Sequence, residues 1–272
     1  MTRDEPWTTR GVILARGLGT RMRKADDAAA LDSSQAAAAD TGVKAMIPTG
    51  RPFVDYLVSA LADAGFTDVC LVIGPEHDAV RSHYAQAQPS RVRIQYAIQH
   101  SPRGTADAVL AAESFAAGNS FVVINSDNYY PVEALAALHV GVSPATIGFD
   151  RDALVELGNV PADRVGRFGA MDIAEDGALR RILLHPTAAM ASHGTIYASL
   201  NCWRFTPAIF DACRAVPPSA RGELELPQAV RLAIEGGLRV EVIRIRAAAL
   251  DMSSRGDIAS VTERLRGVDV RL

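Results

Sequence analysis

Short apolar runs alternate with amphipathic stretches along the first 150 residues of the chain. The runs are too short for most helices and favour buried strands, at residues 11–15, 68–73, 92–98, 121–125 and 145–149. Helical patterns lie between them, beginning at Pro52 and at Pro75 and covering residues 105–117 and 131–140. Strand and helix in alternation predict an α/β fold with a Rossmann-like, doubly wound and mainly parallel sheet.

The pattern changes after about residue 150. Residues 169–173 and 179–184 flank the turn Glu175-Asp176-Gly177 and predict a hairpin. Helices are predicted at 206–215, 226–235 and 254–267, with a strand at 240–245. We therefore expect a mixed extension of the sheet that forms a small second lobe. Residues 1–272 are interpreted as one domain with two halves, 11–150 and 151–272.

An alanine-rich stretch, residues 25–39, follows the first strand and its turn. It carries Asp26, Asp27 and Asp32, and its composition fits either a small helix or a mobile loop. We interpret it as a surface insertion that could also cover a nearby site.

Composition and charge narrow the function classes. The 49% hydrophobic and 22% charged residues exclude a collagen, a disordered chain and a coiled coil. With 28 basic and 31 acidic residues, the chain has no bulk positive field for a nucleic-acid backbone. The three cysteines lack metal-ligand spacing and are expected to be ordinary buried thiols. Without a signal-peptide pattern or an apolar run of membrane-spanning length, a cytoplasmic protein is expected.

The turn after the first strand is rich in glycine and carries candidate chemistry. It reads Leu14-Ala15-Arg16-Gly17-Leu18-Gly19-Thr20-Arg21-Met22. Glycines let backbone N–H groups approach phosphate oxygens, and Thr20 and Arg21 add a hydroxyl and a charged fork. A Walker A motif is absent, and Met22 stands where a dinucleotide fingerprint needs its third glycine. By itself the turn also fits a tight strand-to-helix connection.

Four further segments occur in a fixed order with this turn. They are Lys44-Ala45-Met46-Ile47-Pro48, Gln99-His100-Ser101-Pro102-Arg103-Gly104-Thr105-Ala106, Asn125-Ser126-Asp127-Asn128, and Leu250-Asp251-Met252 with Arg255-Gly256-Asp257-Ile258. Together the five resemble the motifs of the sugar-phosphate nucleotidylyltransferases, in the nucleotide-diphospho-sugar transferase superfamily. The resemblance extends over most of the chain and implies transfer of a nucleotidyl group from an NTP to a sugar 1-phosphate, with Mg²⁺.

The resemblance also implies roles for individual residues. Asp127 and Asp251 would be the Mg²⁺ ligands, and Arg21 and Lys44 would hold phosphates, so that Arg21, Lys44 and Asp127 form the catalytic set. The implied nucleotide-binding residues, in half 11–150, are Ala15, Arg16, Gly17, Gly19, Thr20, Arg21, Gln99, Gly104 and Thr105. The implied sugar-binding residues are Asn128, Gly169, Asn201, Glu223 and Glu225, mostly from half 151–272. Either aspartate could instead cap a following helix or turn.

The chain departs from the family pattern at three places. Arg16 stands where the family usually has Ala or Gly. Leu184-His185-Pro186 replaces a Glu-Lys-Pro element, so two residues that usually meet the sugar phosphate are missing. Met252-Ser253-Ser254 alters the segment after the second predicted metal ligand. These changes leave the triphosphate site plausible and concern the acceptor side most.

UTP or dTTP is the favoured nucleotide, because the Gln99 segment is most familiar from uridylyl and thymidylyl transferases, while related adenylyl and cytidylyl transferases leave other NTPs open. The acceptor is expected to be a sugar 1-phosphate or another phosphorylated molecule such as phosphocholine, with a homo-oligomer possible and no nucleic-acid or membrane partner. The alternative is a non-catalytic relative that binds a nucleotide or nucleotide sugar and has a regulatory role. A nicotinamide-dependent oxidoreductase is disfavoured by the missing third glycine.

Overall fold

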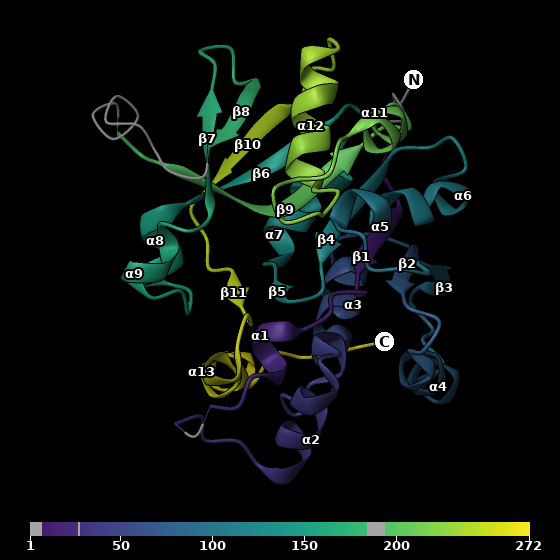
Figure 1. Cartoon of the computed structure of the whole chain (residues 1–272), viewed down its shortest axis with the longest axis vertical. Helices are drawn as coiled ribbons and strands as arrows, with labels where there is room; N and C mark the ends of the chain where they lie inside the picture. The colour runs from purple at the N-terminus through teal and green to yellow at the C-terminus, as the bar shows by residue number, and fades with distance from the viewer. Residues whose placement is uncertain (1–6, 27, 184–193) are drawn as a thin grey trace, which may run out of the picture.

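A mixed sheet of nine strands forms the centre of the molecule (Figure 1). The computed structural model describes residues 7–26, 28–183 and 194–272. The main path of the sheet has the order β10-β6-β9-β4-β1-β2-β3, and β7 and β8 extend it beside β9. The strands are β1 Arg10–Leu14, β2 Asp68–Ile73, β3 Arg93–Ile98, β4 Phe121–Asn125, β6 Ala145–Asp150, β7 Gly169–Ile173, β8 Leu179–Leu183, β9 Tyr197–Phe205 and β10 Glu241–Ile245. Two short strands, β5 Asn128–Tyr129 and β11 Leu250–Asp251, form a separate antiparallel pair.

Strands β3, β2, β1 and β4 are parallel neighbours, so the doubly wound part of the prediction is confirmed. Their carboxyl ends meet at one edge of the sheet, where ligands bind in folds of this type. Strand β9 runs antiparallel between β4 and β6 and joins the two halves of the sheet.

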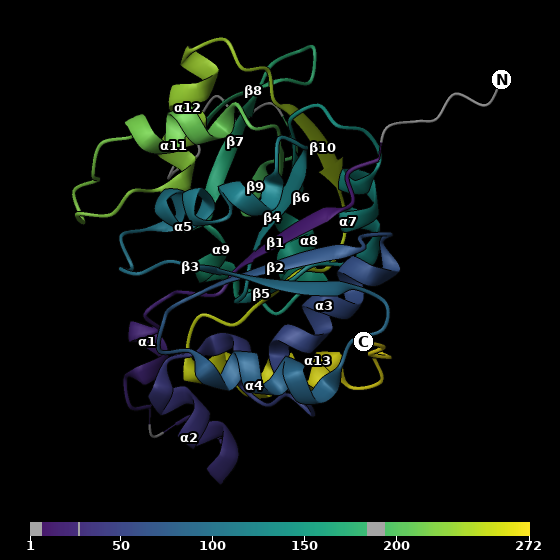
Figure 2. The same ribbon diagram turned by 90° about the vertical axis from the view of Figure 1, so that its right-hand side faces the viewer.

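Alternate side chains of each strand enter two different cores, because successive strand residues point to opposite faces. Ile13 and Leu71 belong to one core, and Val12 and Val72 to the other. Helices cover both faces (Figure 2), with α3, α4 and α13 on one side and α5, α11 and α12 on the other. The helices are α1 Thr20–Arg23, α2 Ser33–Thr41, the 3₁₀ turn η1 Lys44–Met46, α3 Phe53–Asp63, α4 Asp78–Ala87, α5 Thr105–Ala111, α6 Glu113–Ala116, α7 Val132–His139, α8 Arg151–Glu156, α9 Ala162–Val165, α11 Ile209–Ala215, α12 Leu226–Glu235 and α13 Arg255–Leu265.

Most predicted elements are present, with some differences at their boundaries. The expected helix at Pro75 begins later, at Asp78. The expected single helix 105–117 is interrupted at Ala112, which separates α5 from α6. Residues 33–41 of the alanine-rich region form helix α2, with a capping box between Asp32 and Gln35. The second part of that stretch is therefore helical, while the described residues before Ser33 form turns and irregular backbone.

Strand β9 was absent from the predicted elements although it is the longest strand described. Its alternation is broken at Asn201, whose φ of 54° is unusual for a residue in a strand. It also carries Arg204, which is 4% exposed and donates hydrogen bonds to backbone carbonyls at the end of α7 and in the α7–β6 connection. A buried arginine and a left-handed residue hide the apolar pattern from which a strand is predicted.

The cysteines match the prediction of ordinary buried thiols. Cys70, Cys202 and Cys213 are free and buried, as expected, and burial raises the pKa of the Cys70 and Cys213 thiols to about 12. Within the described ranges, no helix combines the length and the apolar character that crossing a membrane requires.

Candidate active site

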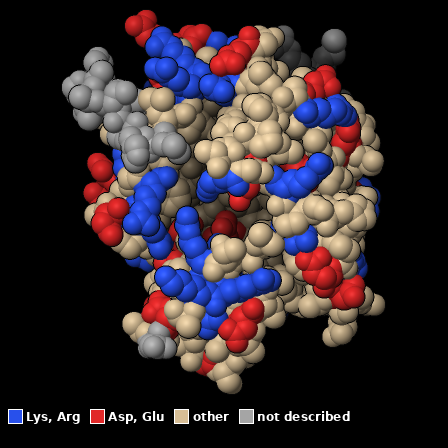
Figure 3. All heavy atoms as spheres, viewed as in Figure 1, with Lys and Arg blue, Asp and Glu red and all other residues tan. Residues whose placement is uncertain are grey.

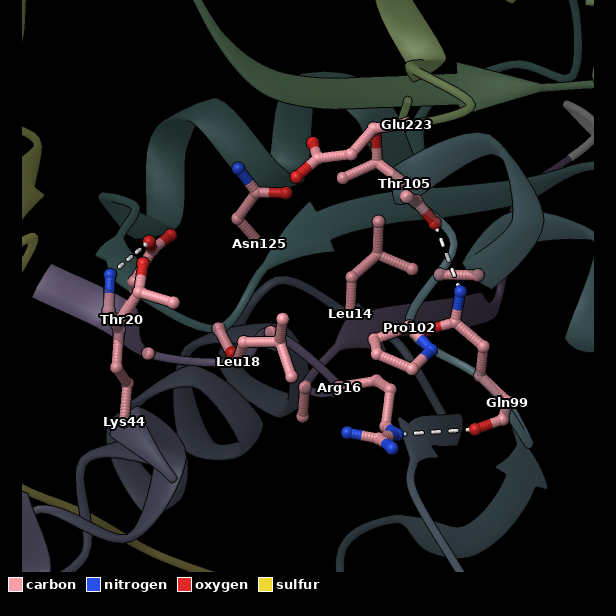
Figure 4. Close-up of a pocket in the computed structure, with 17 residues that line it drawn as sticks. Leu14, Arg16, Leu18, Thr20, Lys44, Gln99, Pro102, Thr105, Asn125 and Glu223 are labelled. Carbon is pink, nitrogen blue, oxygen red and sulfur yellow. Dashed lines mark hydrogen bonds and ion pairs between the residues drawn. The ribbon is translucent and has the colours of Figure 1, made fainter. Parts of the chain in front are cut away.

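A cavity of about 280 Å³ opens at the carboxyl ends of β1, β3 and β4. Segments far apart in the sequence line it, and they include most of the predicted nucleotide site (Figure 4). The predicted residues in its wall are Ala15, Arg16, Gly17, Gly19, Thr20, Lys44, Gln99, Gly104, Thr105, Asp127 and Glu223. The fold thus brings together motifs that the sequence analysis grouped only by resemblance.

Glycine is present at two positions of the first loop, Gly17 and Gly19, for different structural reasons. Gly19 has φ of 60°, and a Cβ there would lie 2.2 Å from the carbonyl oxygen of Gly42, so only glycine fits. A Cβ on Gly17 would meet nothing within 4 Å. Gly19 therefore fixes the loop against the end of the alanine-rich insertion, while Gly17 keeps the backbone accessible at the cavity.

Arg16 lines the cavity, but its guanidinium group is turned toward neighbouring protein groups (Figure 4). Its Nε donates to the carbonyl oxygen of Gln99 at 3.2 Å, and Nη2 lies 2.9 Å from Oε1 of Glu76. A Cβ on Gly74 would come within 2.4 Å of Arg16 Nε, so this glycine makes room for the guanidinium. Arg16 thus connects the cavity wall to the β2–α4 loop.

The side-chain amide of Gln99 has a fixed orientation. Its Nε2 donates to the carbonyl oxygen of Gly104 at 3.0 Å and to Oδ2 of Asp107 at 2.8 Å. A carbonyl and a carboxylate can only accept, so the nitrogen must face them. Arg103 donates to the other oxygen of Asp107 at 2.5 Å. With both amide hydrogens in use, Gln99 keeps its Oε1 as a hydrogen-bond acceptor for a ligand.

The loop that contains Gly104 is joined to the predicted sugar-binding loop. Leu224 N–H donates to the carbonyl oxygen of Arg103, and Ala106 N–H donates to that of Leu224. A Cβ on Gly104 would lie 2.5 Å from the Leu224 carbonyl oxygen. Thr105 Oγ1 accepts from Leu226 N–H at 2.8 Å, at the start of α12. Thr105 Oγ1 thus joins the start of α5 to the start of α12.

The two predicted metal carboxylates come from adjoining backbone segments. Strand β5 pairs with β11, and Met252 N–H donates to the carbonyl oxygen of Asp127 at 2.8 Å. Lys44 Nζ lies 2.9 Å from Asp127 Oδ2 (Figure 4). The helix-capping alternative fails for both aspartates, because no side chain caps α7 and Ser254 is the N-cap of α13, whereas Asp251 does accept from Ser253 Oγ in the turn that follows it.

Asp251 is 3% exposed and is held on several sides. Its carboxylate accepts from Asn128 Nδ2 at 3.1 Å and from Ser253 Oγ at 2.9 Å, and Arg164 Nη2 lies 3.1 Å from Oδ2. Burial and the charge of Asp127 raise the pKa of Asp251 to about 6, against the opposing effect of Arg164. A cation placed between two neighbouring carboxylates stabilises their charged forms, and the effect is greatest for a buried one.

These residues fit Mg²⁺ held jointly with a substrate. No group of three or more His, Cys, Asp or Glu able to hold a metal occurs among the residues that the structure describes. A two-carboxylate site suits Mg²⁺, which keeps several waters and is commonly bound by one or two carboxylates plus phosphates.

The other predicted sugar-side residues do not line the cavity. Asn128 donates to Asp251, and Asn201 Oδ1 accepts from Trp203 Nε1 at 3.2 Å. Gly169 packs on the hairpin, where a Cβ would lie 2.3 Å from Ile182. Burial works to raise the pKa of Glu225, but hydrogen bonds from Arg221 and Ser219 lower it. The Leu184-His185-Pro186 segment lies outside the described residues.

Arg21 does not line the cavity, although cationic side chains surround the hollow on this face (Figure 3). Arg21 is exposed on α1 and makes no ion pair with any side chain that the structure describes. Figure 3 shows Lys and Arg side chains around the hollow in the middle of this face, with acidic side chains deeper inside. A cationic rim above carboxylates suits a polyanion that binds together with a metal ion.

Several polar residues of this site were not predicted. Asp107 orients Gln99, and Arg164 contacts Asp251. Asn159 donates to the Asp251 carbonyl oxygen and accepts from its N–H, which fixes the backbone of β11. Asp107 lies within the helical pattern beside the Gln99 motif, where a carboxylate next to a glutamine could have signalled pairing. Arg164 and Asn159 gave no local signal, because their contacts form only in the folded chain.

Comparison with known proteins shows to which family this chain belongs. The family model described as "Nucleotidyl transferase" matches residues 38–258. The chain belongs to the nucleotidyl transferase family. The resemblance inferred from the five motifs is therefore confirmed at the level of the family.

The individual relatives of this nucleotidyl transferase have low sequence identity to it. A glucose-1-phosphate thymidylyltransferase of Streptomyces antibioticus is 28% identical over 93% of the chain and 65% of its own length. A UTP–glucose-1-phosphate uridylyltransferase, AglF of Haloferax volcanii, is 27% identical over 94% of the chain and 96% of its own length. A UDP-glucose pyrophosphorylase solved with UDP-glucose is 17% identical, with a TM-score of 0.70 over 95% of this chain and 98% of the other. That structure confirms the fold.

Proposed function

We propose that this chain is an Mg²⁺-dependent nucleotidylyltransferase that converts an NTP and a sugar 1-phosphate to an NDP-sugar and pyrophosphate. The observation that carries the proposal is the cavity in which the glycine loop, Gln99, Lys44 and Asp127 meet, with Asp251 on the adjoining strand. Relatives named for thymidylyl and uridylyl transfer to glucose 1-phosphate support the same reaction class.

The reaction is a substitution at the α-phosphorus. A phosphate oxygen of the sugar 1-phosphate forms the new bond, and the bond from the α-phosphorus to the oxygen that bridges to the β-phosphate breaks. The protein contributes orientation and electrostatic stabilisation, because no covalent intermediate is required. When bound at Asp127 and Asp251, Mg²⁺ would neutralise charge on the phosphate oxygens.

The chain's own residues divide the remaining work. Backbone N–H groups of the loop around Gly17 approach the phosphates, and Thr20 adds a hydroxyl. Lys44 reaches from η1 to Asp127 and supplies a positive charge beside the α-phosphate position. Arg21 lies on the first turn beyond the loop, where its free guanidinium can meet the outer phosphates.

The geometry of Gln99 supports UTP or dTTP. Its free Oε1 requires a base edge that donates, and uracil and thymine present N3–H there. The N3 atom of cytosine is an acceptor and would face another acceptor, an arrangement that leaves both polar groups unpaired. We therefore expect the imide bases to be selected over cytosine.

The test is pyrophosphate release from five NTPs paired with a panel of sugar 1-phosphates, with Mg²⁺ present. Release is expected with UTP or dTTP and one sugar phosphate. It should stop when EDTA removes the metal and return when Mg²⁺ is added in excess. Absence of release from every pair, with an NTP still raising the melting temperature, would refute transfer to a sugar 1-phosphate and leave either another phosphorylated acceptor or a nucleotide-binding regulator.

A further inference from the structure

Both carboxylates of the proposed metal site already have a cationic partner in the protein. Lys44 Nζ lies 2.9 Å from Asp127 Oδ2, and Arg164 Nη2 lies 3.1 Å from Asp251 Oδ2. The Arg164 side chain is 17% exposed and that of Asp251 only 5%, so water screens this second pair poorly. An incoming divalent cation must therefore compete with charges that the chain itself supplies.

Arg164 is placed to act on two acidic groups at once. Its Nη1 donates to Asp257 Oδ1 at 2.7 Å, while Nη2 lies beside Asp251. Arg164 lies on α9 and Asp257 on α13, two helices of the second half of the chain. Arg164 therefore links a short helix of the second lobe to the metal site.

The contacts of Arg164 point to charge compensation more than to hydrogen bonding. Its Nε and Nη2 atoms are buried and have no hydrogen-bond partner within the described part of the chain. Nη2 is nevertheless within ion-pair distance of Asp251. A group that leaves buried donors unused but stays between two carboxylates contributes mainly through its positive charge.

The local charge balance then depends on the substrate. Asp127, Asp251 and Asp257 face Lys44 and Arg164, so two of the three negative charges are balanced before any ligand binds. Mg²⁺ gives up its hydration water reluctantly, and the one remaining negative charge compensates little of that cost. A triphosphate adds several negative charges and oxygen ligands at the same place, which changes the balance in favour of the metal.

We propose that Arg164 is a positioning residue that neutralises Asp251 and keeps the metal site weak until the nucleotide arrives. The divalent ion then binds with the NTP rather than before it. This inference rests on the proposed function, since it concerns the metal of that reaction. A purely structural role for Arg164 would affect stability alone and leave metal affinity unchanged.

The test measures Mn²⁺ binding, with Mn²⁺ replacing Mg²⁺ as a spectroscopic probe. Electron paramagnetic resonance of free Mn²⁺ gives its Kd for the protein without nucleotide, and water-proton relaxation reports protein-bound Mn²⁺ with UTP or dTTP. In the wild type, binding without nucleotide should be at least about tenfold weaker than with it. Arg164→Met should tighten nucleotide-free Mn²⁺ binding by about tenfold, since it removes a nearby positive charge at a poorly screened site.

Arg266→Met is the matched control, because Arg266 is 75% exposed and pairs only with Glu263 among the described residues. It removes the same formal charge and should leave the Kd of Mn²⁺ unchanged. If Arg164→Met fails to fold, Lys44→Met tests the same balance from Asp127 and should change nucleotide-free binding in the same direction.

Two results would overturn the inference. One is equal Mn²⁺ affinity of the wild type with and without nucleotide, and the other is unchanged affinity in a folded Arg164→Met protein. Failure of the proposed function has a different signature, namely no pyrophosphate release from any pair of NTP and acceptor, whatever the Mn²⁺ affinity. The titrations and the pyrophosphate assay together therefore distinguish the two failures.

Discussion

The nucleotide side and the acceptor side of the site are built in different ways. On the nucleotide side, residues from the ends of β1, β3 and β4 converge on one cavity, and the parallel sheet itself places them. On the acceptor side, only Glu223 of the four residues from the second half lies in the cavity wall. Gly169 packs within the hairpin, Asn201 accepts from the Trp203 side chain, and Glu225 accepts from Arg221 in its own loop. A site carried by strand ends can be inferred from motifs, whereas one carried by loops depends on tertiary contacts.

The largest expected effect tests whether the strand-end carboxylate carries the chemistry. Asp127→Asn removes a charge at the proposed metal site and should lower the kcat for pyrophosphate release about 10³-fold, as comparable losses of electrostatic stabilisation do. The melting temperature should change little, because the side chain is 30% exposed. Asp211→Asn, at a side chain that is 90% exposed on α11, is the control for a lost charge. Retention of full activity in Asp127→Asn would falsify the metal assignment.

Because of Asp251, activity and stability should change in opposite directions as pH rises. In the metal-free protein its pKa of about 6 means that the carboxyl ionises only above that pH, and a bound metal ion competes with the proton, so activity at limiting Mg²⁺ should rise as pH increases toward 6. The folded-state pKa lies above the unfolded value, so the folded protein binds more protons between pH 4 and pH 6 and loses stability as pH rises. A shift from 3.8 to about 6 corresponds to about 3 kcal/mol.

The measurement is urea unfolding of wild type and Asp251→Asn from pH 4 to pH 7. The free energy of unfolding of the wild type should fall relative to the variant over this range. Parallel curves for the two proteins would contradict a raised pKa and leave the carboxylate ionised throughout.

How far each side could be predicted follows from the same comparison. The short apolar runs identified β1, β3 and β4, and the motifs at their ends reached the cavity. Strand β9 was missed because Asn201 and the buried Arg204 break its apolar pattern. Arg164 was missed because its role needs Asp251 and Asp257, which are brought to it only by folding.

A smaller effect is expected at Gly104, where the nucleotide side contacts the Leu224 loop of the acceptor side. In Gly104→Ala, the new Cβ would lie 2.5 Å from the Leu224 carbonyl oxygen, at a φ of 123° that an L-residue rarely adopts. We expect a loss of about 2 kcal/mol in the free energy of unfolding, from strain and displacement of the Leu224 loop. Gly118→Ala is a matched control, since its φ of 78° is also positive but a Cβ there meets nothing within 4 Å.

The difference between these two glycine variants isolates the contact between loops from backbone strain. Gly104→Ala should also raise the KM of both substrates, since Gly104 and Glu223 line the same cavity. Equal destabilisation of both variants, with unchanged KM values, would mean that the loops are independent.

The smallest effect concerns one hydroxyl that lies on the nucleotide loop but supports the acceptor loop. Thr105→Val keeps the shape of the side chain and removes the acceptor for Leu226 N–H. The unpaired helix-terminal N–H should cost about 1 kcal/mol of stability. Because the affected helix follows Glu223, the KM of the sugar phosphate should rise several-fold while that of the NTP stays nearly constant. Thr105→Ser keeps the hydroxyl and should behave like the wild type. An increase confined to the KM of the NTP would instead assign Thr105 to the nucleotide side, and the boundary between the two sides would then lie beyond α5.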